Sequence, residues 1–161
     1  MLKEMRENDF IVSKTDLKGH ITYTNQIFME MAEYTEVELL GKPHNIIRHP
    51  DMPKAVFKYL WDTIVTKQEV FAFVINQTKN GNGYWVYANI TPSLDANGKL
   101  IGYYSVRRKP NPKALEIIIP LYKTMLEVEK SNGVNASFKV LTDILAEKGV
   151  DYDELILSIQ E

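Results

Sequence analysis

HNIIRHPDMPKAVFKYLW, residues 44–61, joins a proline-bracketed turn to an amphipathic helix. Pro50 disfavours the α conformation at the residue before it, so His49 is expected in extended or turn backbone. Asp51 can then cap the helix that follows, with Pro53 tolerated in its first turn. Large apolar residues recur at spacings of three and four, which predicts one apolar helical face. These residues are Val56, Phe57, Leu60, Trp61 and Ile64.

The same turn gathers three kinds of polar side chain. Arg48, His49 and Asp51 bring a cation, an imidazole and a carboxylate to a helix start, where backbone N–H groups are free. Such an arrangement can hold an anion or a cofactor. An ordinary helix start also uses prolines and a capping Asp without any ligand. The spacing alone leaves both interpretations open.

Composition excludes several classes of function. The chain has 161 residues, 45% of them hydrophobic and 25% charged, which is typical of a globular protein with one sizeable core. A net charge of −2 without a basic run argues against nucleic acid or an anionic membrane as partner. With no cysteine, the chain cannot form disulfides, thiolate zinc sites, iron–sulfur clusters or a cysteinyl–flavin photoadduct. Because no apolar run reaches the length of a signal peptide or membrane span, a soluble, cytoplasmic protein is expected.

Alternation and turn residues predict five strands and an α+β fold. The strands are expected at residues 9–14, 20–23, 70–78, 83–91 and 100–108. Two short helices are expected after the first hairpin, the first capped by Thr24 or Asn25 and the second opened by a Thr35–Glu38 capping box. Two strands, a helical crossover and a three-stranded meander predict a five-stranded antiparallel sheet with helices on one face.

Pro110 and Pro112 mark a boundary between residues 1–110 and a helical extension over 111–161. The extension has apolar residues on opposite helical faces, which indicates burial on two sides. Pro120 removes a hydrogen-bond donor within the first of these helices, so a kink or a restart is expected there. The sequence leaves open whether the extension packs on the open face of the sheet or on another chain.

Four motifs carry a resemblance to a known family. They are NQIF at residues 25–28, HNIIRHPDMP at 44–53, KNGNGYWVYANITP at 79–92 and GYYSVRRKP at 102–110. Together they resemble the FAD-binding PAS domains of Aer-type aerotaxis and energy-taxis sensors of bacteria, including PAS-only proteins of the CetB type. The resemblance covers roughly residues 8–110 and implies a PAS fold that binds FAD non-covalently and reports its redox state to a signalling partner.

The resemblance also implies cofactor-binding residues. Arg48, His49 and Asp51 would belong to the flavin-binding turn and helix, with Arg48 as the first candidate and His49 as the second to meet the diphosphate. The family pattern is not matched everywhere. The departures lie at Val70, Ala72, Ile75, Gln77 and Asn82.

Three more residues follow from the motif match. Asn76 would be the strand amide beneath the ring, and such an amide can both donate to and accept from the edge of an isoalloxazine. Asn25 follows the second strand at another position tied to flavin binding, and Trp85 lies in the YWV strand. The ring would need an apolar slot between sheet and helices. Its expected walls are Val70, Val74, Ile90 and Tyr104.

Other functions remain to be weighed against flavin sensing. A haem held by His44 or His49 would keep the same fold, and so would a PAS core that has lost its ligand and only docks or dimerises. His49 and Asp51 could form an acid/base pair, but no nucleophile or glycine-rich phosphate loop accompanies them, so no enzyme is expected. The partner implied by the resemblance is a membrane-bound chemoreceptor-like signalling protein, with a homodimer as a further possibility.

Overall fold

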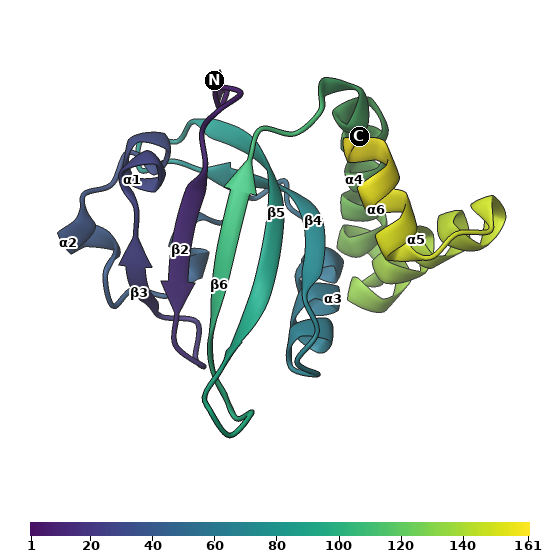
Figure 1. The fold of residues 1–161 in the computed structure, drawn as a ribbon. Coiled ribbons are helices and arrows are strands. Elements are labelled where there is room, and N and C mark those ends of the chain that lie inside the picture. The colour runs from purple at the N-terminus through teal and green to yellow at the C-terminus, as the bar shows by residue number, and fades with distance from the viewer.

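A six-stranded sheet forms the centre of the computed structural model, which describes all 161 residues (Figure 1). The strands are β1 Leu2–Lys3, β2 Ile11–Thr15, β3 Ile21–Thr24, β4 Val70–Gln77, β5 Gly83–Leu94 and β6 Leu100–Arg108. Neighbours follow the order β1-β5-β6-β2-β3, and β4 also pairs with β5. The five predicted strands are confirmed and pair antiparallel.

The sixth strand, β1, makes the sheet mixed. It pairs parallel with the start of β5, with Leu2 opposite Gly83 and Lys3 opposite Tyr84. The sequence did not predict it, because a strand of two residues is too short to show an alternation. Lys3 Nζ also donates to the carbonyls of Glu30 and Met31, which ties this strand to the end of the first helix.

Four short helical segments cover one face of the sheet. They are α1 Gln26–Ala32, α2 Glu36–Leu39, the 3-10 turn η1 His44–Ile47 and α3 Lys54–Ile64. The predicted caps of the first two are confirmed: the Asn25 side chain accepts from Phe28 N, and Thr35 and Glu38 form the capping box. The apolar face of α3 faces the sheet, with Val56, Leu60 and Ile64 each no more than 4% exposed.

The start of α3 differs from the prediction. Asp51 does not cap this helix, because its side chain is 74% exposed and its own backbone N–H donates to Nδ1 of His49. The carboxylate of Glu129 takes the role instead, accepting from Lys54 N at 2.9 Å and from Ala55 N at 3.3 Å. A carboxylate at a helix N-terminus also interacts favourably with the helix dipole.

The C-terminal extension packs beside β4, at the edge of the sheet, and reaches Trp85 of β5 on the face opposite the four helical segments. It consists of α4 Pro112–Asn132, α5 Val134–Lys148 and α6 Tyr152–Gln160, beside β4 in Figure 1. The Tyr122 hydroxyl donates to Phe73 O at 2.6 Å, and the Tyr122 and Trp85 rings lie 6.0 Å apart. Pro120 does not interrupt α4. In this structure the extension therefore packs on the β4 side of the sheet of its own chain.

The extension also reaches around to α3. The ring of Tyr59 on α3 lies 4.3 Å from that of Tyr152 and 6.3 Å from that of Phe138.

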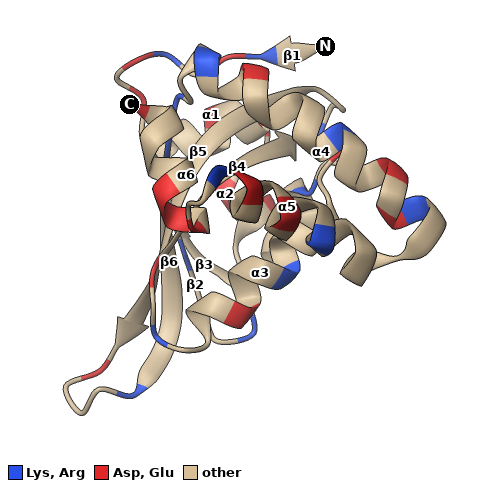
Figure 2. Ribbon diagram, turned by 90° about the vertical axis from the view of Figure 1, so that its right-hand side faces the viewer, with Lys and Arg blue, Asp and Glu red and all other residues tan.

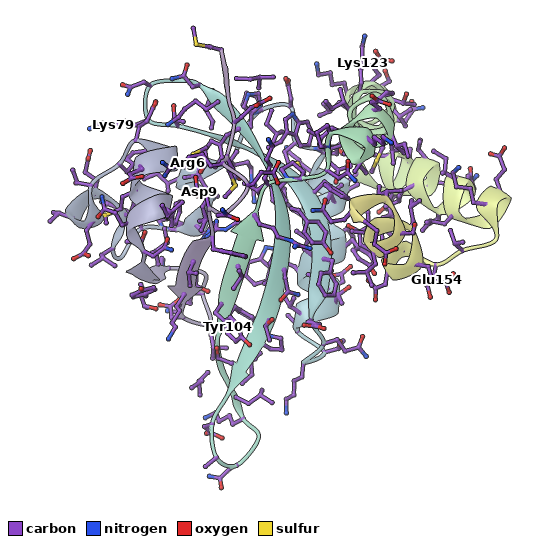
Figure 3. The ribbon with its side chains drawn as sticks, turned by 45° about the horizontal axis from the view of Figure 1, so that its top comes forward. Arg6, Asp9, Lys79, Tyr104, Lys123 and Glu154 are labelled. Carbon is purple, nitrogen blue, oxygen red and sulfur yellow. The ribbon has the colours of Figure 1, made fainter.

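Charges of both signs are spread over the helices of the extension, as Figure 2 shows. Lys123 and Glu154 are exposed on the outside of the extension (Figure 3). No helix is long and apolar enough to cross a membrane.

The Glu129 cap predicts a specific loss of stability. Glu129→Ala should lower the free energy of unfolding by about 1–2 kcal/mol, because two N–H groups of α3 lose their acceptor. Glu127→Ala is the matched control, since Glu127 is exposed on the same helix. Urea denaturation of both variants measures the difference. Equal stability of the two variants would contradict the role given to Glu129.

Candidate functional site

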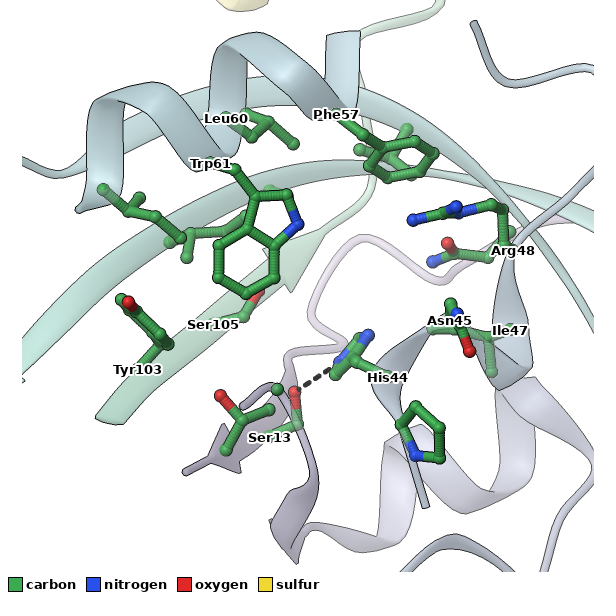
Figure 4. A pocket seen from close by; sticks show the side chains of 18 of the residues that line it. Ser13, His44, Asn45, Ile47, Arg48, Phe57, Leu60, Trp61, Tyr103 and Ser105 are labelled. Carbon is green, nitrogen blue, oxygen red and sulfur yellow. Dashed lines mark hydrogen bonds between the residues drawn. The ribbon is translucent and has the colours of Figure 1, made fainter. Parts of the chain in front are cut away.

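A cavity lies between α3, η1 and the sheet (Figure 4). Its volume is about 240 Å³, and it opens to solvent. Ligand pockets usually measure roughly 300–1,000 Å³, so this cavity suits a compact or planar group better than a bulky one. The walls are mostly apolar and come from α3 and from strands β4 and β5. They include Leu60, Trp61, Ile64, Val74, Ala88 and Ile90.

The alternation of the strands places these walls. Side chains of β4 and β5 point in turn toward the cavity and toward the extension. Val74 and Asn76 line the cavity, whereas Trp85 on β5 lies near Tyr122 of the extension, with ring centroids 6.0 Å apart. On α3, Trp61 meets the ring of Tyr103 edge-on, with centroids 5.6 Å apart.

The charged residues that line the cavity are all basic. Lys18, Arg48 and Arg107 line the cavity, and no Asp or Glu does. The whole chain has a net charge of −2, so this local excess of cations is not a consequence of its composition. A cleft lined by charge of one sign attracts ligands of the other sign, here an anion or a group rich in hydrogen-bond acceptors.

Two residues of the predicted site meet at the edge of β4. Arg48 and Asn76 pair through an isolated antiparallel bridge, although 28 positions separate them in the sequence. The Asn76 side chain is buried, with 4% exposure of the residue, while Arg48 is exposed. The guanidinium of Arg48 lies 4.2 Å from the centroid of the Phe57 ring, which holds it beside the cavity. A cation and an amide thus sit together where a ligand would enter.

A polar cluster lies deeper in the lining. Arg107 on β6 is 3% exposed and donates to Oγ of Ser13 on β2. Its NH1 lies 3.4 Å from Nε2 of His44, which is itself 3.1 Å from Ser13 Oγ. The guanidinium also lies 4.6 Å from the centroid of the Phe28 ring. The cluster therefore contains residues from β2, β6, α1 and η1.

The environment of His44 keeps its ring neutral. Desolvation, with a smaller effect of the Arg107 charge, lowers the pKa of His44 to about 3. Because a guanidinium only donates, Nε2 of His44 must accept, which assigns the ring proton to Nδ1. Burial likewise lowers the pKa of Arg107 to about 10, so Arg107 remains a cation at neutral pH.

Two buried polar atoms near this cluster have no partner in the chain. They are Nε of Arg107 and the hydroxyl of Tyr84, whose pKa is raised by burial. Buried polar groups in folded proteins are nearly always hydrogen-bonded. An unpartnered donor on a cationic, apolar cavity fits a planar ligand with acceptor groups at its edge, and an isoalloxazine is such a ligand.

The remaining predicted residues lie outside the cavity. Asn25 accepts from Val12 N and Phe28 N and donates to Phe10 O, so its amide is used in holding α1 to β2. Trp85 points toward the extension, where it packs near Tyr122.

His49 and Asp51 do not line the cavity either. Nδ1 of His49 accepts from the Asp51 backbone N–H at 3.0 Å, and the side chains are 3.9 Å apart. The structure thus brings Arg48 and Asn76 together and leaves His49, Asp51, Asn25 and Trp85 apart from them. Of the expected walls, Val74, Ile90 and Tyr104 line the cavity and Val70 does not.

The histidines do not form a metal site. No group of three or more His, Cys, Asp or Glu side chains is placed to hold a metal ion. As an axial haem ligand, His44 would have to give up its contacts with Ser13 and Arg107. The geometry therefore favours a small planar ligand over a haem.

Sequence reasoning missed the role of Arg107. Arginines at the end of a strand are usually solvated, so the sequence does not distinguish Arg107 from Arg108. Alternation does place the two on opposite faces of β6, with Arg107 on the same face as Tyr103 and Ser105. The pattern in one strand does not say which face is covered by α1 and η1.

Comparisons with known proteins agree with this architecture. A family model described as PAS fold matches residues 21–107. The aerotaxis receptor of Escherichia coli strain K12 is 40% identical over 121 residues, which are 75% of this chain and 24% of the receptor. The nitrogen fixation regulatory protein of Klebsiella pneumoniae is 28% identical over 160 residues, covering 92% of this chain and 32% of that protein. The chain thus spans about a quarter to a third of these relatives.

Solved structures show the same fold at low sequence identity. A light-oxygen-voltage domain studied with a flavin analogue superposes with a TM-score of 0.61 at 18% identity, covering 71% of this chain and 86% of that one. A PAS domain from Colwellia psychrerythraea gives a TM-score of 0.58 at 18% identity, covering 62% and 85%. With the family model matching more than half of its residues, this chain belongs to the PAS fold family.

Proposed function

We propose that this chain is a redox- or energy-state sensor of bacterial aerotaxis-type signalling that binds FAD in the cavity. The observation that carries the proposal is the cavity lining, which is apolar on its walls, cationic and free of carboxylates. The relatives that are named an aerotaxis receptor and a nitrogen fixation regulator, and the light-oxygen-voltage domain studied with a flavin analogue, support a flavin as the ligand.

The residues present fit this group. The walls formed by Leu60, Ile64 and Val74 exclude water from a planar ring. Asn76 offers an amide to the edge of the ring, and Arg48 at the opening offers a cation to the diphosphate. When bound, the flavin supplies the electron chemistry, while the protein positions it and tunes its potential. We expect no catalysis from the chain itself.

The signal would leave the domain through protein contacts. Three residues of α3 line the cavity: Phe57, Leu60 and Trp61. The same helix contacts α5, and its first N–H group donates to the carboxylate of Glu129 on α4. A change in the ligand that shifts α3 would therefore act on the extension. In the proposal the domain lies in the cytoplasm and its partner is a membrane-bound chemoreceptor-like signalling protein. A second copy of the chain, forming a homodimer, is the alternative partner. Neither nucleic acid nor direct membrane insertion is involved.

Cofactor content tests the proposal directly. The purified chain, reconstituted with FAD, should be yellow, and extraction should release FAD in near-stoichiometric amount. Arg48→Ala should weaken FAD binding about ten- to a hundredfold, because a charge-assisted hydrogen bond contributes about 1.5–3 kcal/mol. Lys58→Ala is the control, since Lys58 on α3 is exposed and pairs with Asp62 at 2.8 Å. Circular dichroism checks that both variants are folded.

Other results would point to other functions. A red-brown protein with an intense Soret band would indicate haem. A colourless protein that does not bind added FAD would indicate a PAS core that serves only to dock. The variant His49→Ala distinguishes between the two residues predicted to bind the diphosphate. His49 lies outside the cavity, whereas Arg48 lines it. A loss of FAD only in the His49 variant would overturn the assignment of the diphosphate to Arg48.

A further inference from the structure

Arg107 is a buried cation without a counter-charge. Its exposure is 3%, and no carboxylate forms an ion pair with it. The groups that face it from β2, η1, α1 and β5 are Ser13, neutral His44, the Phe28 ring and the hydroxyl-bearing Tyr84. None of them carries negative charge at neutral pH. Removing a charge from water without a partner of opposite sign is costly.

The chain satisfies this guanidinium only in part. Its two terminal nitrogens lie near His44 and Ser13, whereas Nε has no partner in the chain. Arg107 is among the residues that line the cavity. The partner that the chain lacks would therefore come from the ligand.

We propose that Arg107 is the counter-charge for the acceptor edge of the ligand ring and that it holds the reduced flavin as an anion. The inference rests on the proposed function and assigns a role to a residue that the predicted site did not include. Arg107 acts on the ring rather than on the diphosphate, because it is buried within the lining, whereas Arg48 and Lys18 are exposed at the opening.

The chemistry of the ring explains why a cation matters there. The pyrimidine edge of an isoalloxazine carries two carbonyl oxygens and a ring nitrogen that can accept a hydrogen bond. Two-electron reduction with uptake of one proton leaves one negative charge on this edge, and uptake of two protons leaves the ring neutral. The electrons come from dithionite in the test and from a reduced electron carrier in the cell. A fixed cation in a low-dielectric site favours the singly protonated form.

Proton uptake measured against electron uptake tests the proposal. The full chain is reconstituted with FAD and titrated with dithionite at several mildly acid pH values, where free reduced flavin takes up two protons. The wild-type protein should take up one proton per two electrons. Arg107→Gln should take up two, and its equilibrium constant for reduction should fall at least tenfold. Arg108→Gln is the matched control, because Arg108 is exposed on the other face of β6, over the Tyr87 ring.

Each result decides the question. Arg107→Lys should keep the uptake of one proton, since it keeps the charge, and this rescue separates charge from packing. If Arg107→Gln does not fold, the wild-type protein alone still decides, because an uptake of two protons overturns the proposal. Wild-type behaviour of a folded Arg107→Gln variant overturns the role of Arg107 while FAD binding stands. A wild-type chain that binds no FAD overturns the proposed function as well.

Discussion

Replacing Gly102 by alanine is expected to lower the free energy of unfolding by about 3 kcal/mol, at the upper end of what overpacking usually costs. A Cβ at this position would lie 2.3 Å from the backbone oxygen of Thr15, and a backbone atom cannot move aside as a flexible side chain can. Gly102 lies in β6 beside a register irregularity between Ser93 and Leu94, where β6 approaches the end of β2 closely. The strands would have to separate to admit a methyl group.

Thermal unfolding measures this effect. A loss of about 3 kcal/mol corresponds to a melting temperature lower by roughly 6–12 °C in a domain of this size. Ile101→Ala is the matched control, because Ile101 is the neighbouring residue and its side chain is 53% exposed. Since Thr15 and Tyr103 both line the cavity, Gly102→Ala should also weaken FAD binding. Similar stability of the two variants would show that the strands can separate without cost.

The second large effect is a dependence of stability on pH that arises from His44. The pKa of His44 is about 3 in the folded chain, while an unfolded histidine titrates near ~6.5. The unfolded chain therefore binds more protons below that value, so stability falls as the pH falls. The stabilising contribution is complete above pH ~6.5 and is lost toward the folded pKa. Between pH 6.5 and 5 the loss should be about 1.6 kcal/mol, because the slope approaches ~1.4 kcal/mol for each pH unit only once the unfolded histidine is fully protonated.

This pH window isolates His44 from the acidic residues. Hydrogen bonds lower the pKa values of Asp9, Asp16, Glu33 and Glu38 in the folded chain, the last to about 2. Their stabilising contributions are lost only below the ordinary carboxyl values of roughly 4. The slope above pH 5 therefore reports mainly on the imidazole.

Urea denaturation at several pH values tests the assignment. In His44→Gln the slope between pH 6.5 and 5 should nearly vanish, because the glutamine can accept from Ser13 and Arg107 but does not titrate. A wild-type chain whose stability is constant over this range would show that the ring is not desolvated as the structure implies.

Much of the local structure was predictable because its interactions join near neighbours. The Asn25 cap and the Thr35–Glu38 capping box each connect a side chain to a backbone N–H three positions away. Period-two alternation likewise separates the residues of β4 that face the cavity from those that face the extension. The α+β class and the PAS architecture follow from such patterns and from the motifs.

The site was predictable only in part. The motif match selected Arg48 and Asn76, which do meet at the cavity. The same motif also contains His49 and Asp51, whose side chains lie elsewhere. A motif places residues along the chain, but the turn at Pro50 determines which of them point inward. The flavin-binding roles of all six residues stay predictions.

The sequence by itself determined the five longer strands, the caps of α1 and α2 and the family, because these depend on contacts within a few positions or on the order of motifs. Only the tertiary structure decided that Glu129 caps α3 across 75 positions and that Arg107 lies buried with Ser13 and His44. It also decided that the extension packs beside β4 and against α3. The physical reason is that such contacts depend on the path of the whole chain, and a buried charge is recognisable only when the elements that remove it from water are in place.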